Sequence, residues 1–170
     1  ELKYAINYWP WNGGPPFDLE KCKYSADWLN KVGAIVKENG MQFCWHNHDK
    51  EFHKMETGLP FDYLMENTDP DLVKCEMDIY WVNYANQDPI AWLKKYPNRF
   101  KLCHVKDLTK KVNNKQESCV IGTGIIDFKK VLKAGAKYGL ASFFVEQEEF
   151  TGTNPIDAAG LGAKYMQKNF

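Results

Sequence analysis

Five strand-like segments alternate with helix-like segments along this chain, and this alternation limits the possible folds more than any other feature of the sequence. The strand-like segments are rich in apolar residues and lie at 2–9, 41–48, 72–82, 100–106 and 141–147. The pattern predicts helices at 18–39, 61–67, 88–96, 127–138 and 155–168, with long loops at 49–60 and 107–126. Strands that alternate with helices form parallel βαβ units. Strands that are apolar on both faces lie in a covered sheet or in a closed barrel.

Ionisable residues stand at the C-terminal ends of four of the five predicted strands. Because residues i and i+2 of a strand share a face, paired residues on one strand project together. In a parallel barrel the C-terminal strand ends meet at one rim, where the active site lies. A mixed set of imidazoles and carboxylates suits a divalent cation such as Mn²⁺, Co²⁺, Zn²⁺ or Mg²⁺. The residues are His46 and His48, Glu76 and Asp78, His104 and Lys106, and Glu146.

Each of these residues also has an ordinary structural interpretation. A single buried histidine is usually a hydrogen-bonded core residue, and a single carboxylate at a strand end usually caps a loop or joins an ion pair. Glu76 lies deeper in its strand than Asp78, and we interpret it as a buried partner of Lys74 or Lys106. For Lys106 the alternative is a salt bridge to Asp107 or Glu76. The joint pattern over adjacent strands favours the metal site.

Charge and motifs exclude several classes of function. Lysines and arginines number 22, as do aspartates and glutamates, so the formal net charge is zero. This balance argues against a nucleic-acid binder and against a protein of anionic membranes. No apolar run approaches the roughly 20 residues that span a bilayer. Gly122-Thr123-Gly124 lacks the third glycine of a nucleotide-binding loop, so we expect no nucleotide and interpret these glycines as shaping the loop before the helix at 127–138.

Cysteine usage bears on the compartment. The chain has five cysteines, an odd number, and no CxxC motif. A disulfide framework is therefore not expected, and a reducing compartment is favoured. We expect a cytoplasmic location, with a periplasmic location as the alternative because the true N-terminus is not visible.

At the same residues the chain resembles the xylose isomerase-like TIM-barrel family of sugar phosphate isomerases and epimerases. The resemblance covers most of residues 40–150, with its motifs in matching order and spacing. It implies a (β/α)₈ barrel with one divalent metal ion at the C-terminal rim. The motifs are WHNHDKEF (45–52), DPDLVKCEMDIYWV (69–82), DPIAWLKKYPNRF (88–100), HVKDL (104–108) followed by GTGIIDF (122–128), and FVEQE (144–148).

The resemblance also implies a ligand set. Asp78, His104 and Glu146 match the family's ligands on strands six, seven and eight. The strand-five position falls on His46, where many members have glutamate, so one of the epimerases' two acid/base carboxylates is missing. His48 and the nearby Glu51 are the substitutes.

The implied chemistry is proton abstraction next to a carbonyl, with a metal-stabilised enediolate. The candidate catalytic residues are Glu146 and His48, as bases, and Lys106, which would neutralise an oxyanion. Trp9 and Trp81 lie at strand ends, where aromatic faces stack on sugar rings, and with Glu51 and Lys106 they are the candidate substrate-binding residues. For Trp45 we favour packing, because it points opposite His46.

These features predict a metal-dependent isomerase or epimerase of a sugar or sugar phosphate. The first alternative is a metal-dependent lyase or dehydratase of a keto-sugar, such as a 3-keto-glycoside. The second alternative is a non-catalytic binding module. An apurinic endonuclease is disfavoured by the neutral charge.

The length suggests an incomplete barrel. A complete (β/α)₈ barrel has eight units in about 250 residues, whereas this chain has 170 residues and five predicted units. We expect one domain over residues 1–170 that corresponds to strands four to eight, with the first three units missing. We further expect a homo-oligomer or the missing N-terminal half to fill the gap.

Overall fold

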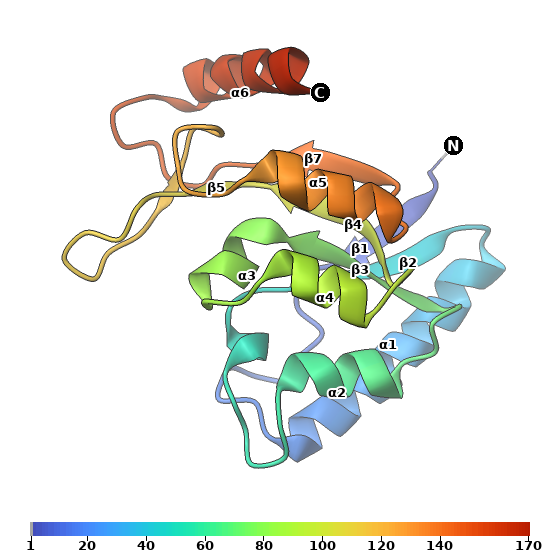
Figure 1. Cartoon of the computed structure of the whole chain (residues 1–170). Coiled ribbons are helices and arrows are strands. Elements are labelled where there is room, and N and C mark those ends of the chain that lie inside the picture. The colour runs from blue at the N-terminus through green and yellow to red at the C-terminus, as the bar shows by residue number, and fades with distance from the viewer. Residues whose placement is uncertain (1) are drawn as a thin grey trace.

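Five parallel strands form one curled half-barrel sheet in the computed structural model, which describes residues 2–170 (Figure 1). Their spatial order, β1-β2-β3-β4-β7, follows their order in the chain. All four pairings are parallel. The predicted α/β fold is thereby confirmed, with β1 and β7 as the edge strands. The bounds are β1 Tyr4–Asn7, β2 Gln42–His46, β3 Val73–Asp78, β4 Phe100–Val105 and β7 Ser142–Val145.

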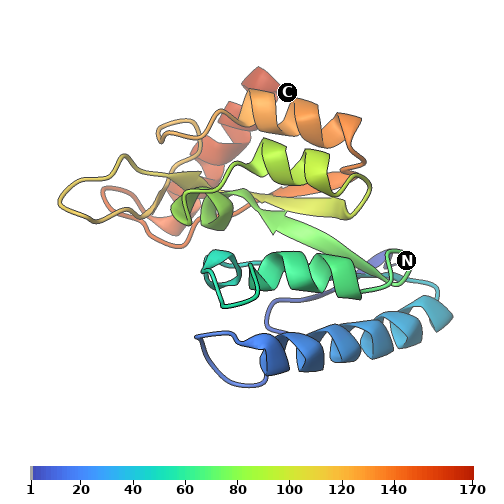
Figure 2. The same cartoon turned by 60° about the horizontal axis from the view of Figure 1, so that its bottom comes forward.

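The helices follow the strands around the half-barrel, with α1 packed beside α2 and α4 beside α5 (Figure 2). Their bounds are α1 Leu19–Glu38, α2 Pro60–Asn67, α3 Ile79–Tyr84, α4 Pro89–Lys95, α5 Phe128–Lys137 and α6 Pro155–Asn169. Within residues 2–170, no helix combines the length and the apolarity needed to cross a membrane.

The predicted strand at 72–82 is wrong beyond Asp78. The strand ends there, and α3 begins, because the Asp78 side chain accepts a hydrogen bond from the Trp81 backbone N–H and so caps the helix. The apolar residues of α3 are buried, namely Ile79, Tyr80 and Val82. A short buried apolar run of this kind is compatible with a strand or with a helix. The two predicted loops are also partly ordered, by a 3₁₀ turn at Lys50–Phe52 and by the short hairpin β5 Asp107–Leu108 and β6 Ser118–Cys119.

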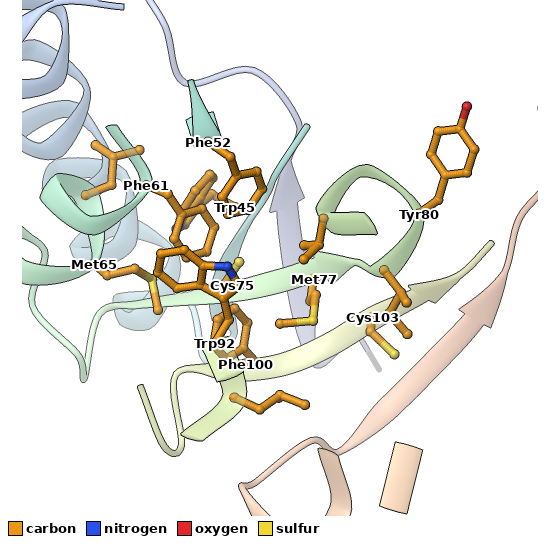
Figure 3. Packing of buried hydrophobic residues seen from close by; sticks show 14 of the residues in the cluster. Trp45, Phe52, Phe61, Met65, Cys75, Met77, Tyr80, Trp92, Phe100 and Cys103 are labelled. Carbon is orange, nitrogen blue, oxygen red and sulfur yellow. The ribbon is translucent and has the colours of Figure 1, made fainter. Parts of the chain in front are cut away.

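An aromatic cluster on the helix side of the sheet fixes the strands in place (Figure 3). Phe61 of α2 lies at its centre, with ring centroids 5.3 Å from Trp45, 4.7 Å from Phe52 and 4.9 Å from Trp92. Trp45 is fully buried in this cluster, which confirms its interpretation as a packing residue. Because side chains alternate along a strand, the neighbouring His46 faces the other side of the sheet.

Asp107 organises the loop that follows β4. Its carboxylate accepts hydrogen bonds from four backbone N–H groups, those of Leu108 (2.8 Å), Gly122 (2.8 Å), Gly124 (2.9 Å) and Ile126 (3.2 Å). A side chain at position 124 would collide with Asp107, so glycine is required there. This arrangement confirms that the glycine-rich segment shapes the loop before α5.

Replacing Asp107 by asparagine is expected to lower the free energy of unfolding by about 2 kcal/mol or more. An amide nitrogen in place of Oδ2 leaves the N–H groups of Gly122 and Gly124 without an acceptor, at about 1–3 kcal/mol each. Urea denaturation measures the change. Asp127→Asn is the matched control, because Asp127 is an exposed N-cap of α5 and asparagine caps equally well. Equal changes in the two variants would contradict this role of Asp107.

Candidate metal centre

The strand registers bring the predicted ligands to one edge of the sheet. His46 and Asp78 are the last residues of β2 and β3, His104 is near the end of β4, and Glu146 directly follows β7. Asp78 is paired with His104, and His46 is paired with Glu76. Residues at paired positions of parallel strands project from the same face as neighbours, so these side chains converge.

Ligand atoms of His46, Asp78 and His104 lie close together, and Glu146 contacts this group through His104. Oδ2 of Asp78 lies 3.7 Å from Nε2 of His46 and 3.7 Å from Nδ1 of His104. Nδ1 of His104 in turn lies 3.0 Å from Oε2 of Glu146. His46, Asp78 and His104 each offer a ligand atom within 4.8 Å of the other two. Two ligands that each bind one tetrahedral Zn²⁺ at about 2.0–2.2 Å are about 3.4 Å apart, so the observed spacing fits a shared cation.

Asp78 is held so that one oxygen faces the two histidines. Its Oδ1 accepts from the Trp81 N–H at 3.0 Å, and its backbone N–H donates to Oδ1 of Asn47 at 3.1 Å. Oδ2 is buried and accepts no hydrogen bond from the described residues. A buried carboxylate oxygen without a partner is costly. A cation shared with the histidines would satisfy it, so the donor set fits a divalent metal ion.

The charges of the site are strongly coupled. Burial alone would lower the pKa of His104, but its interactions with Asp78 and Glu146 and the charge of Glu76 outweigh burial and raise it to about 10. The hydrogen bond with His104 lowers the pKa of Glu146 to about 2, against the effect of burial. Without a cation, the His104 imidazole therefore carries a proton between carboxylates. A metal ion would displace that proton.

Glu76 differs from its sequence interpretation. Among the described residues its ion-pair partners are His46 and His104, whereas Lys74 and Lys106 were expected. The expectation failed because the β2–β3 register, which spacing along the chain does not reveal, sets His46 opposite Glu76.

His48 lies between two tryptophan rings. Its ring centroid is 5.8 Å from Trp9, 5.8 Å from Trp81 and 5.1 Å from His46. Burial lowers the pKa of His48 to about 4, with a further contribution from His46. Its Nδ1 is buried and has no partner among the described residues. At neutral pH the imidazole is therefore neutral, with a nitrogen free to take part in proton transfer.

Lys106 is fully buried beside the cluster. Its Nζ lies 2.8 Å from Oε2 of Glu148 and 3.5 Å from Oε2 of Glu146, and it faces the rings of Tyr80 (4.7 Å) and Trp81 (5.0 Å). The expected alternative pairings with Asp107 or Glu76 are wrong, because Asp107 is engaged by its own loop and Glu76 by the histidines.

Glu51 is set apart from the convergent group. It is fully buried, its oxygens accept from the indole N–H of Trp11 at 2.9 Å and the backbone N–H of His48 at 3.0 Å, and burial raises its pKa. The contact with His48 fixes the segment after β2. Its predicted role in substrate binding stays a prediction.

Sequence reasoning missed three residues of the site, namely Asn47, Tyr80 and Glu148. Asn47 directly follows His46, a predicted ligand. Glu148 lies two residues after Glu146, so the i, i+2 spacing in FVEQE could have identified it as a neighbour on the same face. Tyr80 was hidden by the assignment of 79–82 to a strand.

Comparisons with known proteins bear on the family of the chain. A family model described as "Xylose isomerase-like TIM barrel" matches residues 5–169. The inosose dehydratase of Clostridium tetani (strain Massachusetts / E88) is 35% identical over 174 residues, which cover 91% of this chain and 56% of the relative. The inosose dehydratase of Geobacillus thermodenitrificans (strain NG80-2) is 30% identical over 174 residues, with the same coverage of 91% and 56%. The chain thus spans little more than half the length of these relatives.

Solved structures share the fold. The crystal structure of a sugar phosphate isomerase/epimerase from Parabacteroides distasonis ATCC 8503 is 27% identical with a TM-score of 0.80, and the match covers 97% of this chain and 57% of that chain. The IOLI protein with a bound zinc atom is 18% identical with a TM-score of 0.73, over 99% of this chain and 64% of that chain. At that identity the second likeness concerns the fold alone.

Proposed function

Because this chain belongs to the xylose isomerase-like TIM barrel family, we propose that it carries the metal-binding residues of a dehydratase that acts on a keto-sugar or keto-cyclitol. Relatives that are 30% to 35% identical are named inosose dehydratase, which supports this class of reaction. The sequence had predicted an isomerase or epimerase first and a lyase as the alternative. The relatives' names support the alternative.

The observation that carries the proposal is the convergence of His46, Asp78 and His104, with Glu146 3.0 Å from His104 and with Oδ2 of Asp78 buried and without a partner among the described residues. These four residues would hold one divalent cation. When bound, the cation supplies Lewis-acid stabilisation of the negative charge that develops on a carbonyl oxygen.

His48 is the proposed proton-transfer residue. Its neutral imidazole would take the proton from the carbon next to the carbonyl, and the electrons of that C–H bond would form the enolate double bond. When the carbonyl forms again, the electrons of the enolate double bond form a C=C bond to the next carbon, and the C–O bond between that carbon and its hydroxyl breaks. The protonated His48 would then return its proton to the departing hydroxide, so that water leaves and the imidazole is restored.

Lys106 and the tryptophans would position the substrate. The buried Nζ of Lys106 lies beside the carboxylates of Glu146 and Glu148 and faces the rings of Tyr80 and Trp81. From this site, largely withdrawn from water, it would stabilise an oxyanion of the substrate. Trp9 and Trp81 flank His48 and would stack on the carbon ring. Glu51 would fix the backbone of His48.

A second candidate is the isomerase or epimerase. The likeness to the Parabacteroides distasonis sugar phosphate isomerase/epimerase, at 27% identity, favours it. Both reactions begin with the same proton abstraction. In this second reaction Glu146, whose side chain is 34% exposed, would return the proton to the neighbouring carbon in an isomerase, or to the opposite face of the same carbon in an epimerase.

A substrate panel separates the candidates. The protein, first stripped of metal by a chelator, would be reloaded with Mn²⁺, Co²⁺, Zn²⁺ or Mg²⁺ and incubated in deuterated water with an inosose, a 3-keto-glycoside and aldose/ketose pairs. Metal-dependent loss of one water by mass spectrometry supports the dehydratase. Deuterium uptake with no loss of water supports the isomerase or epimerase. No turnover with any metal would contradict both and favour a non-catalytic binding module.

Replacing His48 by glutamine is expected to lower kcat by about 10²–10⁴-fold, the usual contribution of a general base. Metal affinity should stay near that of the wild type, because His48 is outside the proposed ligand set. Steady-state kinetics and a metal titration measure the two quantities. His53→Gln is the matched control, since the His53 side chain is 61% exposed. A kcat within twofold of the wild type would exclude His48 as the base.

A further inference from the structure

The two histidines of the metal centre face a single carboxylate oxygen on the side away from the proposed cation. Oε2 of Glu76 lies 3.1 Å from Nδ1 of His46, within a hydrogen bond, and 3.4 Å from Nε2 of His104. The opposite nitrogens, Nε2 of His46 and Nδ1 of His104, are the ones that lie 3.7 Å from Oδ2 of Asp78. Each imidazole is therefore bracketed between Glu76 and the metal position.

Glu76 is placed there by the sheet rather than by a loop. It is paired with His46 on β2 and with Leu102 on β4, two residue pairs before the Asp78–His104 pairing. It is 2% exposed, and its other oxygen, Oε1, has no partner among the described residues. A buried carboxylate in this setting is costly unless its interactions with the imidazoles compensate.

We propose that Glu76 is a positioning residue that fixes which nitrogen of each histidine is presented to the cation. By accepting the Nδ1–H of His46 and the Nε2–H of His104, one oxygen selects opposite tautomers in the two rings. It also holds both ring planes in place. Carboxylates that hold the far nitrogen of a metal-binding histidine orient the ring and raise its basicity. This inference rests on the proposed metal site, because it assigns the orientation of that site's own ligands.

The test compares two substitutions of matched size. Glu76→Gln can place its carbonyl oxygen where Oε2 lies and its amide nitrogen where the unpartnered Oε1 lies, so it keeps the shared acceptor and loses only the charge. Glu76→Met has a similar volume and no comparable acceptor. Zinc affinity, measured by competition with a chromophoric chelator, should weaken by about 10–100-fold in Glu76→Met, and Glu76→Gln should lie nearer to the wild type.

Imidazole ¹⁵N NMR of the zinc-bound protein identifies which ring nitrogen of each histidine carries the proton. In the wild type and in Glu76→Gln, the protonated nitrogens should be Nδ1 of His46 and Nε2 of His104. In Glu76→Met this single pattern should be lost. Neither a stability defect nor a simple charge effect predicts that difference, and circular dichroism verifies that both variants fold.

Several outcomes would overturn the inference. If Glu76→Met binds zinc with the affinity of the wild type, Glu76 does not position the two histidines. Equal weakening in Glu76→Gln and Glu76→Met assigns the effect to charge alone, which also contradicts it. If the wild type itself binds no divalent cation, the proposed function falls together with this inference, whereas the first two results leave the proposed function intact.

Discussion

Replacing Asp78 by asparagine is expected to weaken the binding of a divalent cation by more than about 100-fold, beyond the 10–100-fold typical of residues outside the ligand set. Asparagine keeps an oxygen for the Trp81 N–H, so the cap of α3 survives. Its amide nitrogen then takes the place of Oδ2 and points N–H donors at the cation. If the amide instead turned its oxygen to the cation, the cap would be lost.

Isothermal titration with Zn²⁺ or Mn²⁺ measures this loss, and kcat should fall with it. Asp127→Asn serves as the control, because it makes the same exchange at the exposed N-cap of α5, where the Asp127 carboxylate pairs with Lys130. Unchanged metal affinity in Asp78→Asn would show that the Asp78 carboxylate does not bind the cation, and would contradict the proposed metal centre. An equal loss in Asp127→Asn would assign the effect to helix capping instead.

Replacing Lys106 by methionine is expected to lower kcat by about 10²–10³-fold, equivalent to about 2.7–4 kcal/mol, the scale seen when one oxyanion-stabilising group is removed. Methionine fills the space of the aliphatic stem, so the contacts with Tyr80 and Trp81 persist without the charge. The metal affinity should not fall, because a positive charge has been removed from beside the cation.

Lys101→Met is the matched control for this variant. Lys101 lies on the same strand, β4, toward its opposite end, and donates to the carbonyl of Gly139. Its replacement should leave kcat within twofold of the wild type. If Lys106→Met raised KM alone with kcat unchanged, Lys106 would bind ground state and transition state equally, and its role in oxyanion stabilisation would be wrong.

The sequence predicted the alternation of strands and helices because apolar runs and turn residues act locally. It also predicted that His46, Asp78, His104 and Glu146 meet, since each stands at the C-terminal end of a parallel strand, and such ends share one edge of the sheet. In the structure, ligand atoms of His46, Asp78 and His104 lie within 4.8 Å of one another and Glu146 lies 3.0 Å from His104, while the role of the four residues as ligands stays a prediction.

The contacts of a side chain that depend on strand register or on long-range packing could not be predicted from the sequence. Whether Glu76 contacts a lysine or a histidine depends on how β2 and β3 are aligned, and a shift of this register by one residue would change the side chains that face Glu76. Lys106 finds Glu148, 42 residues away in the chain, only after β7 pairs with β4. Residues 79–82 are apolar enough to form a strand. They form a helix instead because the Asp78 side chain caps its N-terminus.

The most direct test of the metal centre is a crystal structure of the zinc-bound protein with anomalous diffraction at the zinc edge. The geometry predicts one peak per chain, at about 2.0–2.2 Å from Nε2 of His46, Nδ1 of His104, Oδ2 of Asp78 and Oε2 of Glu146. A peak away from these atoms, or a zinc ion that contacts His46 and His104 through their Glu76-facing nitrogens, would contradict the centre described above.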